Sequence, residues 1–166
     1  MRSLVLLALV VLALLLQSTV FAIFQVAGVK PDLILMLVVF NGFLQGSREG
    51  AFLGFLAGLL QDFFTGSYIG LNALTKMLAG YLVGLAEGRL YKESVVLAAI
   101  MTFLASIVSQ FAYYILLFYL GIQVPPLIAV LQVIIPTAIY TSLLVPLAYW
   151  KFMRSNEKGW LRYREP

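Results

Sequence analysis

The chain contains no cysteine and no histidine, and only 11% of its 166 residues are charged. The missing cysteine excludes disulfides and thiolate chemistry, and the missing histidine removes the commonest proton shuttle and metal ligand. The sequence offers no cluster of metal-ligating residues and no Walker motif, and it places only one aspartate well inside a predicted span, so we expect no aspartyl pair. We therefore expect neither an enzyme nor a protein with a cofactor or a metal.

Apolar residues dominate what is present. They make up 63% of the chain, and the mean hydropathy is +1.01, whereas soluble domains are about half apolar and about a quarter charged. A soluble chain of this composition would expose far more apolar surface than a monomer tolerates. The composition predicts an all-α, polytopic membrane protein with one domain. The net charge of +4, concentrated at the C-terminus, suggests anionic lipid rather than nucleic acid as a partner.

Apolar segments predict six transmembrane helices, because a span needs about 20 residues. The first segment also fits a signal peptide cleaved after Ala22, but its apolar character continues past that residue, which favours an uncleaved span. The second and third segments are short, so they either barely span the bilayer or form a re-entrant hairpin. The predicted spans are 4–24, 32–47, 50–64, 71–86, 95–120 and 127–150, followed by a basic tail at 151–166.

Basic residues predict the orientation of these spans. With both termini in the cytoplasm, nine lysines and arginines lie on the inner side, and Lys30 is the only basic residue in an outer loop. This asymmetry follows the positive-inside rule. The tail carries five of the nine, which we expect to contact the lipid surface: Lys151, Arg154, Lys158, Arg162 and Arg164.

Two rows of glycines lie in the third and fourth segments. Residues four apart share a face of a helix, and small residues in such rows let helix backbones approach closely within a bilayer. In an antiparallel hairpin the two rows match in order, with the contact centred on Gly54–Gly84 or Gly58–Gly80. The rows either close this hairpin or leave a groove for a partner helix. They comprise Gly50, Gly54 and Gly58 in one segment and Gly80, Gly84 and Gly88 in the other.

Asp62 and Lys76 are the only charged residues placed well inside predicted spans. In the same antiparallel register they lie at matching depth, so we expect them to form an ion pair that offsets the cost of burial. Gln61 and Asn72 would supply supporting hydrogen bonds. A role in transport or proton relay is the alternative, but one pair without further carboxylates or histidine makes a poor relay.

Several motifs resemble those of the rod shape-determining protein MreD family. They are Pro31-Asp32, the run Gly58-Leu59-Leu60-Gln61-Asp62, the run Gly70-Leu71-Asn72-Ala73-Leu74, and Gly80-Tyr81. The resemblance implies a fold similar to the six-helix substrate-binding subunits of energy-coupling-factor vitamin transporters. It also implies a scaffold in the bacterial inner membrane that binds MreC. Through MreC, it would connect MreB filaments to the peptidoglycan synthase made of RodA and a class B penicillin-binding protein.

Two functions therefore remain open at this stage. One is a scaffold that recognises partner transmembrane helices and helps to maintain rod shape and regulate peptidoglycan synthesis. The other is a substrate-binding membrane subunit of a vitamin-type transporter. That function would need an outward-facing polar pocket, for which Asp62, Asn72, Tyr113 and Tyr114 are candidates.

Overall fold

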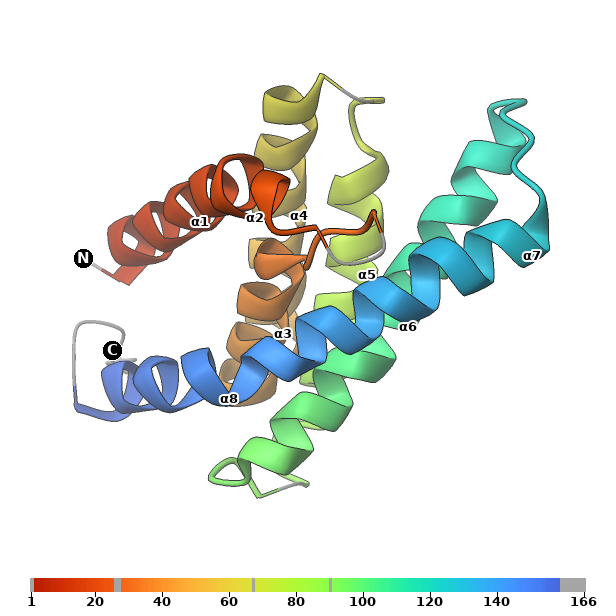
Figure 1. Cartoon of the computed structure of the whole chain (residues 1–166). Helices are drawn as coiled ribbons and strands as arrows, with labels where there is room; N and C mark the ends of the chain where they lie inside the picture. The colour runs from red at the N-terminus through yellow and green to blue at the C-terminus, as the bar shows by residue number, and fades with distance from the viewer. Residues whose placement is uncertain (1, 26–27, 67, 90, 159–166) are drawn as a thin grey trace.

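The computed structural model describes residues 2–25, 28–66, 68–89 and 91–158, and its regular elements in that part of the chain are all helical (Figure 1). This confirms the predicted all-α fold. The elements are α1 (Arg2–Ser18), α2 (Val20–Ile23), α3 (Leu33–Gln45), α4 (Ser47–Thr65), α5 (Leu71–Gly84), α6 (Val95–Tyr119), α7 (Pro126–Ile128), the π-helix η1 (Ala129–Ile134) and α8 (Ile135–Lys158).

Local sequence explains several helix boundaries. The side chains of Asp32 and Ser94 accept hydrogen bonds from backbone N–H groups in the first turns of α3 and α6, as N-caps do. Gly46 alone separates α3 from α4, with a φ of 98° that favours glycine. The π-helix η1 comes just before Pro136. A proline ring displaces the carbonyl four residues earlier, which here belongs to Gln132 within η1.

Helix α3 lies at the centre of the fold. Of its 13 residues, 11 are buried, because α1, α4, α5, α6 and α8 all pack around it. In Figure 1, α3 stands between α1 and the pair α4–α5, and α8 crosses in front of it. The apolar core therefore runs from α3 outward to one face of α1 and to the last turns of α8, where Tyr149 and Phe152 pack on Phe40.

Glycines bring the backbones of α3, α4 and α5 into direct contact. A Cβ atom added at Gly50 would collide with the carbonyl oxygen of Gly80 and would lie 2.7 Å from the Cα of Gly42. Gly42 was missed in the sequence because it lies on α3, in the segment before the two that carry the glycine rows. A Cβ atom at Gly84 would collide with the backbone of Ser47. The glycines of the two helical rows are thus used inside the fold, and they do not form an open groove for a partner.

The register of α4 and α5 differs from the prediction by about two turns. Gly54 faces the backbone of Lys76, eight residues before Gly84, and Gly58 faces Asn72 and Ala73. Gly88 does not join the row, because α5 ends at Gly84. A repeat of four residues looks alike after each turn, so the pattern alone does not select one register. In the observed register α4 extends past the start of α5, as Figure 1 shows.

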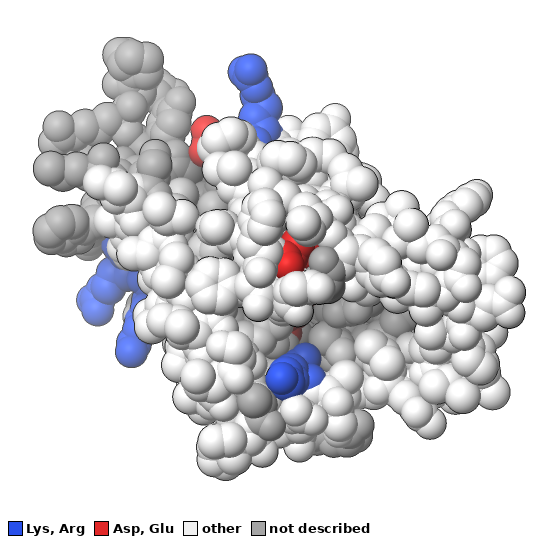
Figure 2. Space-filling model, turned by 90° about the horizontal axis from the view of Figure 1, so that it is seen from above, with Lys and Arg blue, Asp and Glu red and all other residues white. Residues whose placement is uncertain are grey.

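Two helical stretches are long and apolar enough to cross a membrane among the residues described, namely Val95–Tyr119 and Pro126–Ser155. Leu4–Ser18 and Leu33–Gln45 are apolar but shorter, so the count of six spans stays a prediction. Large apolar side chains are exposed on most helices. Figure 2 shows one face on which charged groups are few and widely separated. Such a surface suits contact with lipid or with partner helices.

Contacts between distant segments define one end of the molecule. Lys92, in the loop after α5, donates a hydrogen bond to the carbonyl of Leu44 and pairs with Glu87. The hydroxyl of Tyr149 on α8 donates to the carbonyl of Lys92. This end therefore joins the last turn of α3, the loop after α5 and the last turns of α8.

We expect Gly54→Ala to destabilise the fold by about 1–3 kcal/mol, the usual cost of overpacking, because the added methyl group would push α4 away from the backbone of α5. Thermal unfolding in detergent measures the effect. Leu56→Ala is the matched control on the same helix, since Leu56 is 41% exposed; this change should move stability by about 0.5 kcal/mol or less. Equal melting of Gly54→Ala and the unmodified chain would contradict the close backbone contact.

Candidate functional site

A cluster of buried polar residues lies where α3 and α5 begin and α4 ends. Asp32 immediately precedes α3, Asp62 occupies the last turn of α4, and Asn72 and Lys76 lie in the first two turns of α5. Asp32, Asp62 and Lys76 are at most 5% exposed. Charged groups buried this deeply are costly unless other groups compensate them, so their partners define what the site can do.

The carboxylate of Asp62 caps the N-terminus of α5. It accepts hydrogen bonds from the backbone N–H groups of Gly70 at 2.8 Å and Ala73 at 3.3 Å. It also accepts from the backbone and the side-chain amide of Asn72. The residue at the cap position itself, Gly70, has no side chain to offer. The neighbouring helix α4 therefore supplies the acceptor. Its carboxylate bonds to the free N–H groups at the start of α5 and is also favoured by the positive end of the helix dipole of α5.

Lys76 forms its ion pair with Asp32. The distance from its Nζ to Oδ2 of Asp32 is 2.6 Å, and the two side chains are 2% and 7% exposed. The predicted pair of Lys76 with Asp62 is therefore corrected. In the observed register, Asp62 lies beyond the first turn of α5 and bonds to its N–H groups, while Lys76 extends toward the start of α3.

Asn72 links the two buried acids through its side-chain amide. Its Nδ2 donates to Asp62 at 2.8 Å, and its Oδ1 accepts from Nζ of Lys76 at 3.2 Å. The result is a continuous chain of polar contacts from Asp62 through Asn72 and Lys76 to Asp32. Gln61 is also buried, and its Oε1 has no hydrogen-bond partner in the described part of the chain.

Asp32 connects three helices. Its Oδ1 accepts from the backbone N–H of Leu35 at 2.9 Å and so caps α3, while its Oδ2 pairs with Lys76 on α5. Its own backbone N–H donates to the hydroxyl of Thr141 on α8 at 3.0 Å. The sequence indicated that Asp32 suits a helix start, but not that it is the partner of Lys76. The sequence could have identified Asp32 as a possible partner of Lys76. A buried lysine needs a nearby carboxylate, and an aspartate at the end of a span can supply one as well as an aspartate inside a span.

A polar cavity of about 280 Å³ opens beside this ion pair. Every side chain around it carries a polar group, which is unusual in so apolar a chain. Of the four residues suggested for a transporter pocket, Asn72 and Tyr113 line the cavity; Asp62 does not, and Tyr114 instead donates a hydrogen bond to the carbonyl of Val124. The lining residues are Gln17, Lys30, Asp32, Gln61, Thr65, Asn72, Thr75, Lys76, Ser109, Gln110, Tyr113 and Thr137.

Other predicted site residues lie elsewhere. Lys151 and Arg154 are exposed near the end of α8, far along the chain from the polar cluster. The side chains of Lys158, Arg162 and Arg164 lie outside the described residues. In the part of the chain that the structure describes, no three His, Cys, Asp or Glu side chains gather where they could hold a metal ion.

A set of substitutions tests which acid pairs with Lys76. Lys76→Met should destabilise the fold by about 3–5 kcal/mol, because it leaves the carboxylate of Asp32 buried without its cation. Adding Asp32→Asn should recover much of that loss, since asparagine keeps the helix cap without the charge. Adding Asp62→Asn should instead make the loss larger, because the α5 cap is weakened as well. Thermal unfolding in detergent reads out all three; better recovery with Asp62→Asn would contradict the assignment.

A comparison with protein families gives one match to this chain. The family model described as rod shape-determining protein MreD matches residues 1–155, which include all four residues of the polar cluster and the glycine contacts. Among curated proteins and among solved structures, nothing matches. The match covers most of the chain and agrees with its apolar, helical architecture. The chain therefore belongs to the rod shape-determining protein MreD family, whose members act in cell shape at the membrane.

Proposed function

We propose that the chain is a non-enzymatic scaffold of the bacterial cell-elongation machinery, which binds MreC and helps to regulate peptidoglycan synthesis. The family match carries this proposal, because it covers residues 1–155. Through MreC, the scaffold would act with MreB filaments, RodA and a class B penicillin-binding protein. It would be a multi-pass protein of the inner membrane.

The distribution of basic residues supports cytoplasmic termini. Lys92, Lys151 and Arg48 lie at one end of the molecule, where the last turn of α3, the loop after α5 and the last turns of α8 meet. Lys30 lies at the opposite end, beside the polar cluster. The positive-inside rule would put the first end in the cytoplasm.

A partner helix would dock on an exposed face, since the glycines of the two helical rows contact one another's helices. One such face is a stripe on α6, where residues three or four apart are exposed along most of the 25-residue helix. Its length suits a single transmembrane helix of a bitopic partner. We define the α6 stripe as Val96, Ile100, Leu104, Val108, Phe111, Ile115 and Phe118.

The absence of cysteine from the chain makes this surface testable by cross-linking. Leu104→Cys on the α6 stripe should cross-link to cysteines placed in the transmembrane helix of MreC in cell membranes. Leu143→Cys, equally apolar and 67% exposed on α8, is the matched control and should not. Both variants should restore rod shape to cells depleted of the chain. Cross-links at Leu143→Cys alone would overturn the choice of face.

The scaffold itself has a separate test. Depletion of the chain from a rod-shaped bacterium should round the cells and remove MreC from the complex with RodA and the penicillin-binding protein, as measured by co-purification. Gly58→Leu should fail to restore either property, because its side chain would collide with the backbone of α5 at Asn72. Normal cell shape and an intact complex after depletion would contradict the proposed function.

The polar cavity favours a second candidate, a substrate-binding membrane subunit of the vitamin-transporter kind. Its volume of about 280 Å³ is close to the lower limit for small-molecule pockets, about 300 Å³. Mass spectrometry of the detergent-purified chain should recover a vitamin in stoichiometric amount if this candidate is correct. We expect none, because Lys76 and Asp32, the charged pair beside the cavity, already compensate each other, although the Oε1 atom of Gln61 in its lining has no partner in the described part of the chain.

A further inference from the structure

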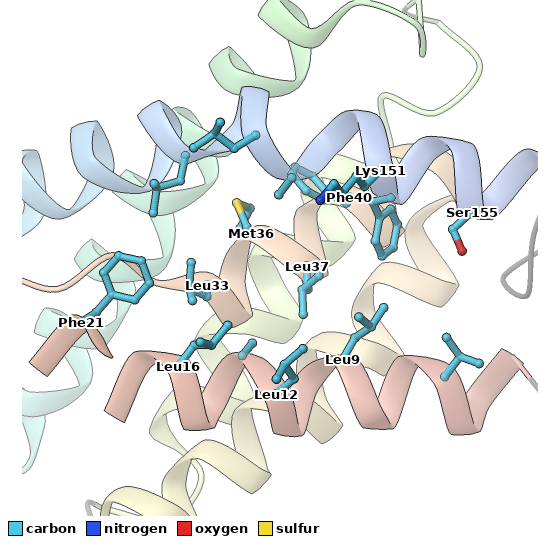
Figure 3. A pocket seen from close by; sticks show the side chains of 16 residues that line it. Leu9, Leu12, Leu16, Phe21, Leu33, Met36, Leu37, Phe40, Lys151 and Ser155 are labelled. Carbon is cyan, nitrogen blue, oxygen red and sulfur yellow. The ribbon is translucent and has the colours of Figure 1, made fainter. Parts of the chain in front are cut away.

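A second, larger cavity separates α1 from α3 and α8. Its volume is about 540 Å³, and 14 of its 16 lining residues are apolar. Figure 3 shows leucines of α1 facing α8 across the cavity, with Met36, Leu37 and Phe40 of α3 at its base. We call this cavity the α1–α8 groove. It lies apart from the polar cluster and shares no lining residue with the polar cavity.

An apolar cavity of this size needs an apolar occupant. Cavities lined by leucine and phenylalanine do not hold water stably, and an unfilled one forfeits the dispersion contacts of all the side chains around it. Helix α1 meets the core through Leu6, Val10, Ala13 and Leu14. On its groove side, Leu12 is 52% exposed. In a membrane, hydrocarbon chains are the nearest material that can fill the space.

The groove is polar at one end only. Lys151 and Ser155 lie together at that end in Figure 3, and Phe21 and Leu33 lie toward the other. Lys151 is exposed, so its ammonium group is free to meet a headgroup at the membrane surface. Arg154, which is also exposed, lies one turn further along α8. A positive end next to an apolar channel matches an amphiphile with an anionic head and a hydrocarbon tail.

The volume argues against a partner helix as the occupant. A transmembrane helix about 10–12 Å wide cannot lie within a groove of about 540 Å³; it could only cover the opening and insert a few side chains, whereas an acyl chain is thin enough to lie along the groove. We propose that the α1–α8 groove binds an anionic phospholipid, with an acyl chain between α1 and α8 and the phosphate beside Lys151. The lipid would complete the packing of α1 against the rest of the fold.

Lipid titration of the purified full-length chain tests this site without any partner protein. In a non-ionic detergent, native mass spectrometry should show phosphatidylglycerol binding more tightly than phosphatidylcholine with the same acyl chains. Lys151→Ala should weaken phosphatidylglycerol binding about fivefold, the factor for ~1 kcal/mol from one basic residue at a lipid surface. Arg48→Ala is the control, because Arg48 is exposed near the same end but does not line the groove.

A filling substitution tests the apolar part of the groove. Leu12→Trp should abolish tight binding of both lipids, whereas Leu143→Trp, on α8 outside the groove, should leave it unchanged. Equal effects of Lys151→Ala and Arg48→Ala would overturn the headgroup assignment. Retained binding in Leu12→Trp would overturn the acyl-chain site. If Leu12→Trp instead kept lipid binding but lost MreC in co-purification, the groove would belong to the partner.

Discussion

The fold depends on the close approach of three helix backbones at Gly42, Gly50 and Gly80. Water drives helices together in soluble proteins, but a bilayer supplies little such force, so packing distance and polar contacts decide which helices associate. The missing side chains let α4 lie directly on α5, and Gly42 lets α3 fit into the same junction. Most of α3 is buried, because α1, α6 and α8 pack on the sides that this junction leaves open.

The sequence predicted the helices well and their mutual register poorly. Apolar runs located the long helices in the described part of the chain, since length and composition are properties of each segment alone. Their ends differ from the prediction, because α1 stops at Ser18 and α8 runs on to Lys158, into the predicted tail. The pairing of α4 with α5 was also predicted from the glycine rows. Their register was wrong by about two turns, because a four-residue repeat is equivalent after each turn and only the connection between the helices distinguishes the alternatives. Gly54 faces Lys76 as a result, and Gly42 was missed because it lies on α3, whereas the predicted contact involved only α4 and α5.

The same shift in register explains the partners in the polar cluster. A carboxylate one turn beyond the start of a helix has backbone N–H groups within reach, so Asp62 needs no lysine to compensate its charge. Lys76 is then available to Asp32, which the sequence placed correctly at a helix start but left without a partner. The residues of the candidate site were thus mostly identifiable from their chemistry. Their pairing was not, because it depends on an offset between helices that no local pattern encodes.

This arrangement separates a rigid interior from an adaptable surface. Breaking a buried ion pair costs about 3–5 kcal/mol, whereas coupling between sites in proteins is typically about 1–3 kcal/mol. A partner that binds with ordinary coupling therefore does not supply enough free energy to separate Lys76 from Asp32, and signals that pass through this interior are disfavoured. Binding to the exposed face of α6, or to the side of α1 that faces the groove, does not require this ion pair to break. Regulation of a protein built in this way would act through the molecules that cover those two surfaces, and the polar cluster would hold the geometry of the surfaces constant.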